Sequence, residues 1–182
     1  MLYKIKKFLN KHRKAFYSFA ITNRQFMSFN ILLVIETSLL VMLTQGIKTW
    51  GIKTSFFDFA IILLFGSIGY LFKPKKQYRY FQTVICIITA ICIINAIYYT
   101  FYDSYVTVGL IESLGQTKTV TGAVFDKLEP IHFIYIIFPL IFAHIHRRLL
   151  KHNYFNYIEK IENSRKNFST TMLVGVIVLC LN

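Results

Sequence analysis

The side chains of this chain that could do chemistry are polar residues set inside long apolar runs. Glu36 lies near the middle of the first run, and Asp58, Asn95 and His132 lie in three others. If these runs cross a membrane, an ionised carboxylate at the position of Glu36 is costly, so the acid is protonated or paired with a neighbouring helix. Two interpretations of Glu36 stay open: a contact for a proton or a substrate, and a neutral acid that hydrogen-bonds to another helix.

A second group of polar residues is expected at one depth, near the outer leaflet, because the apolar runs alternate in direction. It combines Asp58, Asn95 and His132 with an aromatic and acidic stretch: Tyr98, Tyr99, Tyr102, Asp103 and Tyr105. Polar and aromatic side chains that converge at one depth could hold a lipid headgroup. Tyrosines also gather at membrane interfaces as simple anchors. Both interpretations stay open.

No pattern in the sequence indicates catalysis or metal binding. His144 and His146 are two residues apart, so on a helix their rings point to opposite faces and a shared metal is not expected. The three cysteines lie inside apolar runs and form no C-x-x-C pair. Nucleophile elbows, phosphate-binding glycine loops and H-E-x-x-H are also absent from the sequence. We therefore expect no cofactor in this chain and no catalytic residues of its own.

The elements that must position these residues are membrane-spanning helices. Of the 182 residues 55% are hydrophobic and 16% are charged, with a mean hydropathy of +0.49. The charges gather in short blocks between the apolar runs, as in chains whose main solvent is lipid. We predict an all-α, multi-pass transmembrane bundle. Its expected spans cover residues 26–45, 56–72, 80–100 and 131–145, followed by a fifth, incomplete span over 168–182.

The charge distribution predicts the orientation of the bundle. Segments 1–25, 73–79 and 146–167 carry net charges of +7, +4 and +4, whereas segments 46–55 and 101–130 carry +2 and −2. Basic segments stay on the cytoplasmic side. We therefore expect a cytoplasmic N-terminus, an outer loop over 101–130 and a location in the cell membrane.

Two of the basic segments have the composition of interfacial helices. Residues 1–25 and 146–167 combine lysines and arginines with apolar residues at helical spacing, which predicts that both lie on the inner leaflet and contact its anionic lipids. The net charge of +13 does not indicate a nucleic-acid partner, because the basic residues occupy several loops rather than one groove. The fifth apolar run is about 15 residues long, short of the roughly 20 needed to span. It runs outward, so we expect a full protein to continue outside the cell.

One stretch carries a family resemblance. From Asn95 the sequence reads NAIYYTFYDSYVTVGLIESLGQ and then TGAVFDKLEPIHFIYIIF. The Asn followed by tyrosines, the Asp103-Ser104 turn (in the reverse of the usual order), the step at Gly122 and the entry at Lys127-Leu128-Glu129 resemble the membrane domain of the lipoteichoic acid synthase family. By motif the resemblance covers residues 80–146, and by span number and orientation it covers the whole chain.

The resemblance implies a function that lies mostly outside this chain. Members have five transmembrane helices followed by an extracellular phosphatase/sulfatase-like domain, and they transfer glycerol phosphate from phosphatidylglycerol to an external polymer of the cell wall. A Thr nucleophile and a manganese site in that outer domain carry the chemistry, and no residue of this chain corresponds to them. Phosphoethanolamine transferases share a similar architecture, so the transferred group stays open.

Two functions from different classes follow. The first is the anchoring membrane domain of a phosphoglycerol transferase, which would contact membrane lipids and phosphatidylglycerol at the outer leaflet. The second is a stand-alone small membrane protein, such as an assembly partner or a transporter subunit, which the intramembrane acids Glu36 and Asp58 favour. Replacement of Glu36 by Gln would abolish transport if that acid relays protons.

Overall fold

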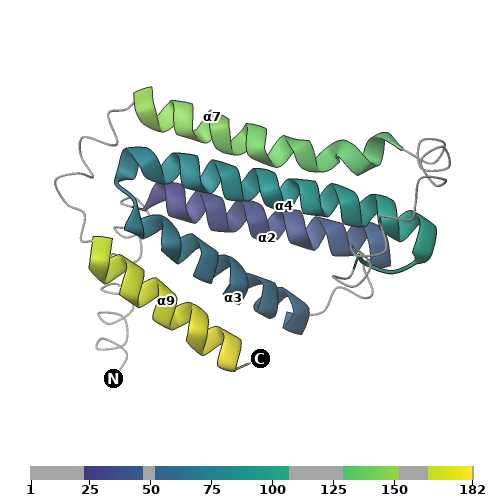
Figure 1. Cartoon of the computed structure of the whole chain (residues 1–182), viewed down its shortest axis with the longest axis horizontal. Helices are drawn as coiled ribbons and strands as arrows, with labels where there is room; N and C mark the ends of the chain where they lie inside the picture. Colours follow the sequence, from purple (N-terminus) through teal and green to yellow (C-terminus); the bar gives the residue numbers. More distant parts are fainter. Residues whose placement is uncertain (1–22, 47–51, 107–128, 152–163, 182) are drawn as a thin grey trace, which may run out of the picture.

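The computed structural model describes residues 23–46, 52–106, 129–151 and 164–181, and every element in these ranges is a helix (Figure 1). The elements are α2 (Arg24–Gln45), α3 (Ile52–Ile68), η2 (Gly69–Leu71), α4 (Pro74–Tyr102), η4 (Pro130–Ile136), α7 (Ile137–Lys151) and α9 (Ser164–Cys180). The all-α prediction is confirmed. Most of segment 1–25, most of the loop 101–130 and residues 152–163 of the inner segment lie outside the described residues, so the predictions made for them stay predictions.

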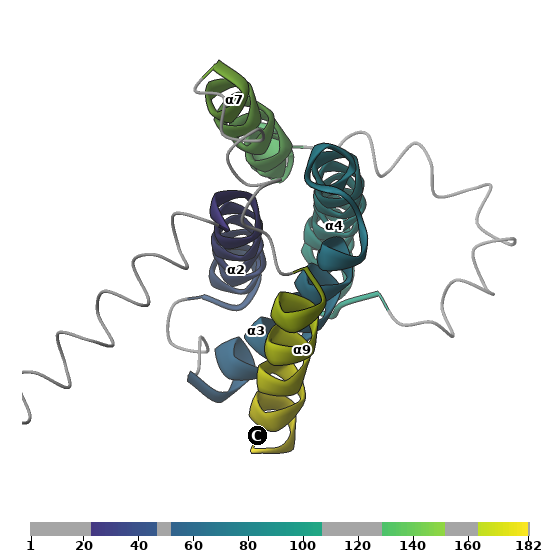
Figure 2. The ribbon, with the colours of Figure 1, turned by 90° about the vertical axis from the view of Figure 1, so that its left-hand side faces the viewer.

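The helices form a bundle with α2 and α4 at its centre. α7, continued from η4, packs against both of them on one side, and α3 packs on α2 on the other side (Figures 1 and 2). α9 is the outermost helix and packs on α3 and η2. The long helices α2, α4 and η4–α7 therefore share one interior, to which α9 contributes little.

Aromatic side chains fill this interior. The rings of Phe29 and Phe81 stack at 4.4 Å, and Phe142 meets Phe81 edge-on at 6.3 Å. All three side chains are almost completely buried. Gly69 is required beside them, because a Cβ at that position would collide with the Phe81 ring. Gly66 likewise lies against Phe26 and Asn30, so these two glycines let α3 and η2 approach α2 and α4 closely.

Within the described ranges, three helices are long and apolar enough to cross a membrane: Arg24–Gln45, Lys76–Tyr102 and Pro130–Lys151. Two further apolar helices, Phe56–Leu71 and Lys166–Cys180, are shorter. The structure therefore supports a multi-span membrane bundle, whereas the expected number of four complete spans is not established by it. Large apolar side chains are exposed along the outer faces, such as Leu140 at 64% and Leu173 at 61%, as lipid contact requires.

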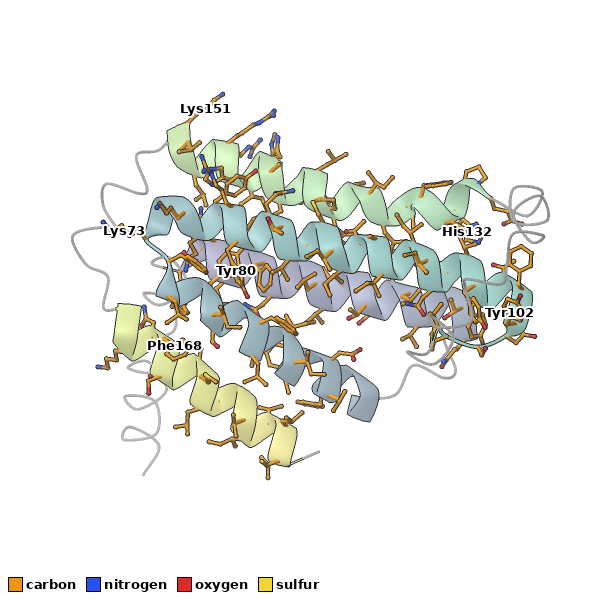
Figure 3. All side chains as sticks on the ribbon, in the orientation of Figure 1. Lys73, Tyr80, Tyr102, His132, Lys151 and Phe168 are labelled. Carbon is orange, nitrogen blue, oxygen red and sulfur yellow. The ribbon has the colours of Figure 1, made fainter. Side chains whose placement is uncertain are left out.

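The two ends of the bundle differ in residue type. Figure 3 shows Lys73 and Lys151 at one end, and Tyr102 and His132 at the opposite end. We call these the Lys73 end and the His132 end. α4 begins at the Lys73 end with Pro74, whose fixed φ suits the first turn of a helix, and it runs to Tyr102 at the other end.

Candidate site at the His132 end

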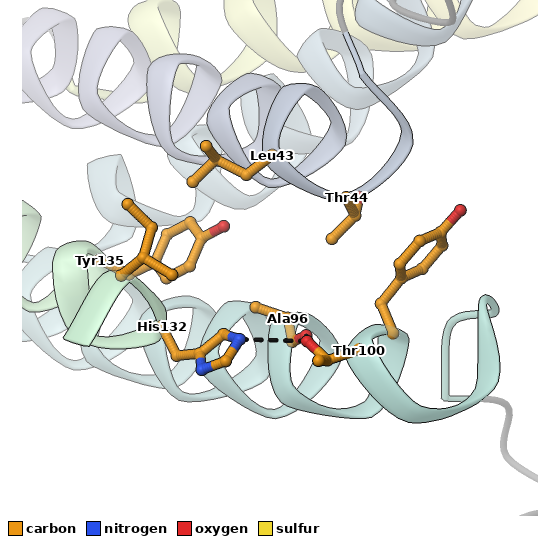
Figure 4. A pocket seen from close by; sticks show the side chains of 8 residues that line it. Leu43, Thr44, Ala96, Thr100, His132 and Tyr135 are labelled. Atoms are coloured by element: carbon orange, nitrogen blue, oxygen red, sulfur yellow. Dashed lines mark hydrogen bonds between the residues drawn. The ribbon is translucent and has the colours of Figure 1, made fainter. Parts of the chain in front are cut away.

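A pocket of about 110 Å³ lies at the His132 end, between α2, α4 and η4 (Figure 4). Its lining combines apolar side chains with hydroxyl groups and one imidazole: Leu43, Thr44, Ala96, Tyr99, Thr100, Ile131, His132 and Tyr135. Each of the three elements supplies part of this lining. The pocket therefore depends on how these elements pack, and it is not a feature of a single loop.

His132 is held in one orientation and one tautomer. η4 starts with a capping box between Glu129 and His132, in which the His132 Nδ1 accepts the Glu129 backbone N–H at 3.0 Å. Because Nδ1 accepts, the ring proton lies on Nε2, which is 3.1 Å from Thr100 Oγ1 and donates to it. Thr100 in turn donates its own proton to the Ala96 carbonyl at 3.1 Å. The buried imidazole thereby ties η4 to α4.

Tyr105 lies beside the pocket, where its hydroxyl contacts the lining residue Thr44. Thr44 Oγ1 donates to the Leu40 carbonyl at 2.7 Å, so the contact of 2.6 Å between Thr44 Oγ1 and the Tyr105 hydroxyl has Tyr105 as its donor. Burial raises the pKa of the Tyr105 phenol, and it outweighs the Thr44 hydrogen bond, which lowers that pKa. The phenol therefore keeps its proton at physiological pH and can donate as this geometry requires.

Tyr135 contributes a hydroxyl group that lacks a partner. Its side chain is completely buried, and its hydroxyl makes no hydrogen bond within the described part of the chain. Figure 4 shows the ring directed toward the space between Leu43 of α2 and Ala96 of α4. An unpartnered buried hydroxyl costs free energy, so its presence beside a pocket is a property to be explained.

Glu36 lies deeper in the bundle than this pocket. The carboxyl is fully buried, and Thr89 Oγ1 of α4 donates to its Oε1 at 2.6 Å. Its Oε2 is buried and has no partner among the described residues. The hydrogen bond to a neighbouring helix is thus present on one oxygen only, and both interpretations of this acid stay open.

A family model described as the Lipoteichoic acid synthase N-terminal domain matches residues 2–182. The chain belongs to this family. The match confirms the predicted resemblance and extends it from the stretch around Asn95 to nearly the whole chain. Neither a curated protein nor a solved structure matches the chain.

This lipoteichoic acid synthase N-terminal domain brings some of the predicted site residues together and separates others. Tyr99 and His132 line the pocket, and Tyr105 lies beside it through Thr44. Asn95 holds the residues that follow α4 in place, because its Oδ1 accepts the backbone N–H of Val106 at 2.9 Å. Asp58 belongs elsewhere: it lines a second pocket, of about 100 Å³, with apolar residues and Thr37 of α2, α3 and α4.

Tyr102 and Asp103 do not line the pocket of this domain. Tyr102 is 55% exposed and stacks on Tyr98 at 4.4 Å, which suits a tyrosine at a membrane interface. Asp103 ends α4 in a left-handed conformation (φ 49°), and its backbone N–H donates to the Tyr99 carbonyl. We conclude that its role here is to turn the chain back toward α2.

Three polar lining residues were not predicted from the sequence: Thr44, Thr100 and Tyr135. A signal existed for Tyr135, because it follows His132 by three residues and so shares a helical face with it. Thr44 and Thr100 gave no signal, since a threonine inside an apolar helix usually bonds its own backbone. Among the described residues of the domain, no three His, Cys, Asp or Glu side chains cluster as a metal site would require. The pocket offers hydrogen bonding to a ligand.

Proposed function

We propose that this chain is the membrane domain of a phosphoglycerol transferase resembling lipoteichoic acid synthase. It anchors and positions an external catalytic domain that moves glycerol phosphate from phosphatidylglycerol to an extracellular polymer. The family match over residues 2–182 is the observation that carries this proposal. The Thr nucleophile and the manganese that the family uses are assigned to that external domain.

The proposal includes the orientation of the bundle. The Lys73 end faces the cytoplasm and contacts anionic inner-leaflet lipids, and the His132 end faces outward. The support is charge: segments 73–79 and 147–151 contain seven basic residues and no acid, and Figure 3 shows Lys73 and Lys151 of these segments at the same end of the bundle. An external catalytic domain then lies on the same side as the pocket.

We also propose that α3 with η2 forms the fourth complete span. At about 1.5 Å per residue, Ile52–Leu71 extends over roughly 30 Å, the thickness of the hydrocarbon core. The segment is strongly apolar, and its contacts with α2 and α9 place it inside the bundle. α9 is then the start of the fifth span.

Deletion of the gene tests the transferase proposal. The amount of extracellular glycerol-phosphate polymer should fall, and a plasmid copy of the gene should restore it. An unchanged amount of polymer, in cells where no second such gene is expressed, would contradict the proposal.

Orientation is tested separately by single-cysteine labelling in a cysteine-free background. A cysteine at Ser104 should react with an impermeant maleimide on intact cells, and one at Lys151 should react only after lysis.

The alternative is a stand-alone membrane protein, such as an assembly partner or a transporter subunit. The buried, unpartnered Oε2 of Glu36 is the observation that favours it. Under this alternative, Glu36→Gln abolishes a transport activity while the amount of protein in the membrane stays constant. Under the anchoring proposal, the same variant leaves polymer synthesis at the level of the parent protein.

A further inference from the structure

The unpartnered Tyr135 hydroxyl is the best indication that the pocket at the His132 end binds something. A buried hydroxyl without a hydrogen bond destabilises the protein, and replacement by phenylalanine would remove that cost while keeping the ring. The side chain is completely buried and lies on the pocket wall. A ligand that hydrogen-bonds to this group would satisfy it.

Three other polar groups of the wall, on Thr44, Thr100 and His132, already have hydrogen-bond partners. The Thr44 and Thr100 hydroxyls donate to the carbonyls of Leu40 and Ala96, and both ring nitrogens of His132 are engaged. Each threonine oxygen keeps acceptor capacity, since a hydroxyl has two lone pairs. The wall therefore presents acceptors from Thr44 and Thr100, together with the phenols of Tyr99 and Tyr135, each of which can both donate and accept.

The described part of the wall favours an uncharged ligand. An anionic phosphate accepts hydrogen bonds and donates none, and no Lys or Arg is among the eight described lining residues. An ammonium group would find acceptors, but no Asp or Glu is among the described lining residues to balance its charge, and burying an unpaired charge is costly. A hydroxyl-rich, uncharged group both donates and accepts, and so it matches the wall.

The size and the rim of the pocket further limit the kinds of ligand that it can bind. Its volume of about 110 Å³ suits one small polyol group or a few waters, each of which occupies about 30 Å³ in the liquid. Leu43 and Ile131, at 46% and 44% exposed, present apolar surface on the lipid-facing rim. A ligand that carries both a polyol and acyl chains can occupy the two environments together.

We propose that this pocket binds the hydroxyl-bearing end of a polyol lipid headgroup, and that the Tyr135 hydroxyl selects for it. This proposal rests on the proposed function, because that function brings such a lipid to the domain. Two sources share the chemistry: the terminal glycerol of a phosphoglycerol lipid and the sugar of a neutral glycolipid. The phosphate of the first source stays outside the pocket.

Native mass spectrometry of the full-length protein in detergent tests the proposal. The protein is titrated separately with phosphatidylglycerol, phosphatidylethanolamine and a glucosyl-diacylglycerol of equal acyl length. We expect one of the two polyol lipids to be retained more strongly than phosphatidylethanolamine, and the preferred one identifies the source. Tyr135→Phe should weaken that retention about fivefold, the ratio expected for one hydrogen bond. Retention of all three lipids to the same extent would overturn the proposal.

Two further variants separate recognition from folding. Ala96→Leu fills the pocket and should also abolish the preference, whereas Tyr98→Phe removes a hydroxyl at the same depth, outside the pocket, and should leave it intact. Without added lipid, Tyr135→Phe should be as thermally stable as the parent protein, or more so. A loss of stability on Tyr135→Phe with unchanged lipid retention would show that the hydroxyl serves a buried water only, and that result overturns the proposal.

The outcome is independent of the test of the transferase proposal. If gene deletion removes the polymer but all three lipids are retained equally, only the proposal that the pocket binds a polyol headgroup is wrong. Normal polymer on gene deletion together with a Tyr135-dependent lipid preference would remove the transferase proposal and leave a lipid-binding membrane protein.

Discussion

The Lys73 end and the His132 end of the bundle are assembled from different kinds of contact. At the Lys73 end, side chains that are far apart in sequence meet directly. Gln25 Nε2 donates to His146 Nδ1 at 3.0 Å, and the His146 ring stacks on Tyr78 at 3.5 Å. The Tyr70 hydroxyl donates to Asn23 Oδ1 at 2.8 Å. These contacts join α2 to α7 and α2 to η2.

At the His132 end a pocket lies between α2, α4 and η4. Two contacts cross between elements here, from His132 to Thr100 and from Tyr105 to Thr44. Thr44 and His132 also bond locally, to Leu40 and Glu129. The Tyr135 hydroxyl has no partner there among the described residues. One end of the bundle therefore fixes the packing of the helices, whereas the other leaves a space that a ligand can enter.

The largest expected effect belongs to the aromatic core. Phe81→Ala removes a ring that packs on Phe29 and Phe142, and it should destabilise the domain by about 3–5 kcal/mol. Unfolding in mixed micelles, followed by circular dichroism, measures this change. Ile94→Ala, at a position that is 56% exposed, is the control and should cost far less. Equal losses for the two variants would contradict the core as described.

The next effect should distinguish the two ends. His132→Ala removes hydrogen bonds to both Glu129 and Thr100, and we expect a loss of about 1–3 kcal/mol together with loss of the lipid preference. The same unfolding assay and the lipid titration measure both effects on one preparation. Retained lipid preference in this variant would place the ligand elsewhere in the bundle.

A smaller effect is expected at the Lys73 end. Gln25→Leu keeps the approximate size of the side chain and removes its hydrogen bond to His146, so the stability should fall by about 1 kcal/mol. Lipid preference should not change, because the site lies at the opposite end of the bundle. A change in lipid preference with this variant would show that the two ends are coupled, and the comparison would then fail.

The sequence predicted the class of the fold because a membrane-spanning helix requires about 20 mostly apolar residues in a row. Such runs can be recognised in a single sequence. The predicted span 80–100 is a clear case: α4 contains all of it and continues beyond both ends, since Pro74 can start a helix and Asp103 ends it. Span 56–72 was less predictable. The helix changes from α to 3₁₀ at Gly69, where a Cβ would collide with the Phe81 ring of another helix, and such packing between helices cannot be read from the sequence.

The site was predictable only in part, because depth in the membrane does not specify which face of a helix a residue occupies. Asp58 and His132 were expected at one level, yet they line different pockets, one between α2, α3 and α4 and the other between α2, α4 and η4. Tyr99 was expected and lines the site, whereas Tyr102, three residues later, stacks on Tyr98 and is exposed. The partner of Glu36 could not be predicted either, because the hydrogen bond from Thr89 depends on the register between α2 and α4.

One measurement tests the central claim, that this domain positions a phosphoglycerol transferase and presents its lipid. In the encoded full-length protein, residues 1–182 are replaced by an unrelated five-span anchor with the same orientation, and extracellular glycerol-phosphate polymer is quantified at equal amounts of protein on the cell surface. The amount of polymer should fall well below the parent level. Polymer at the parent level would contradict this claim, because the domain would then be an interchangeable anchor.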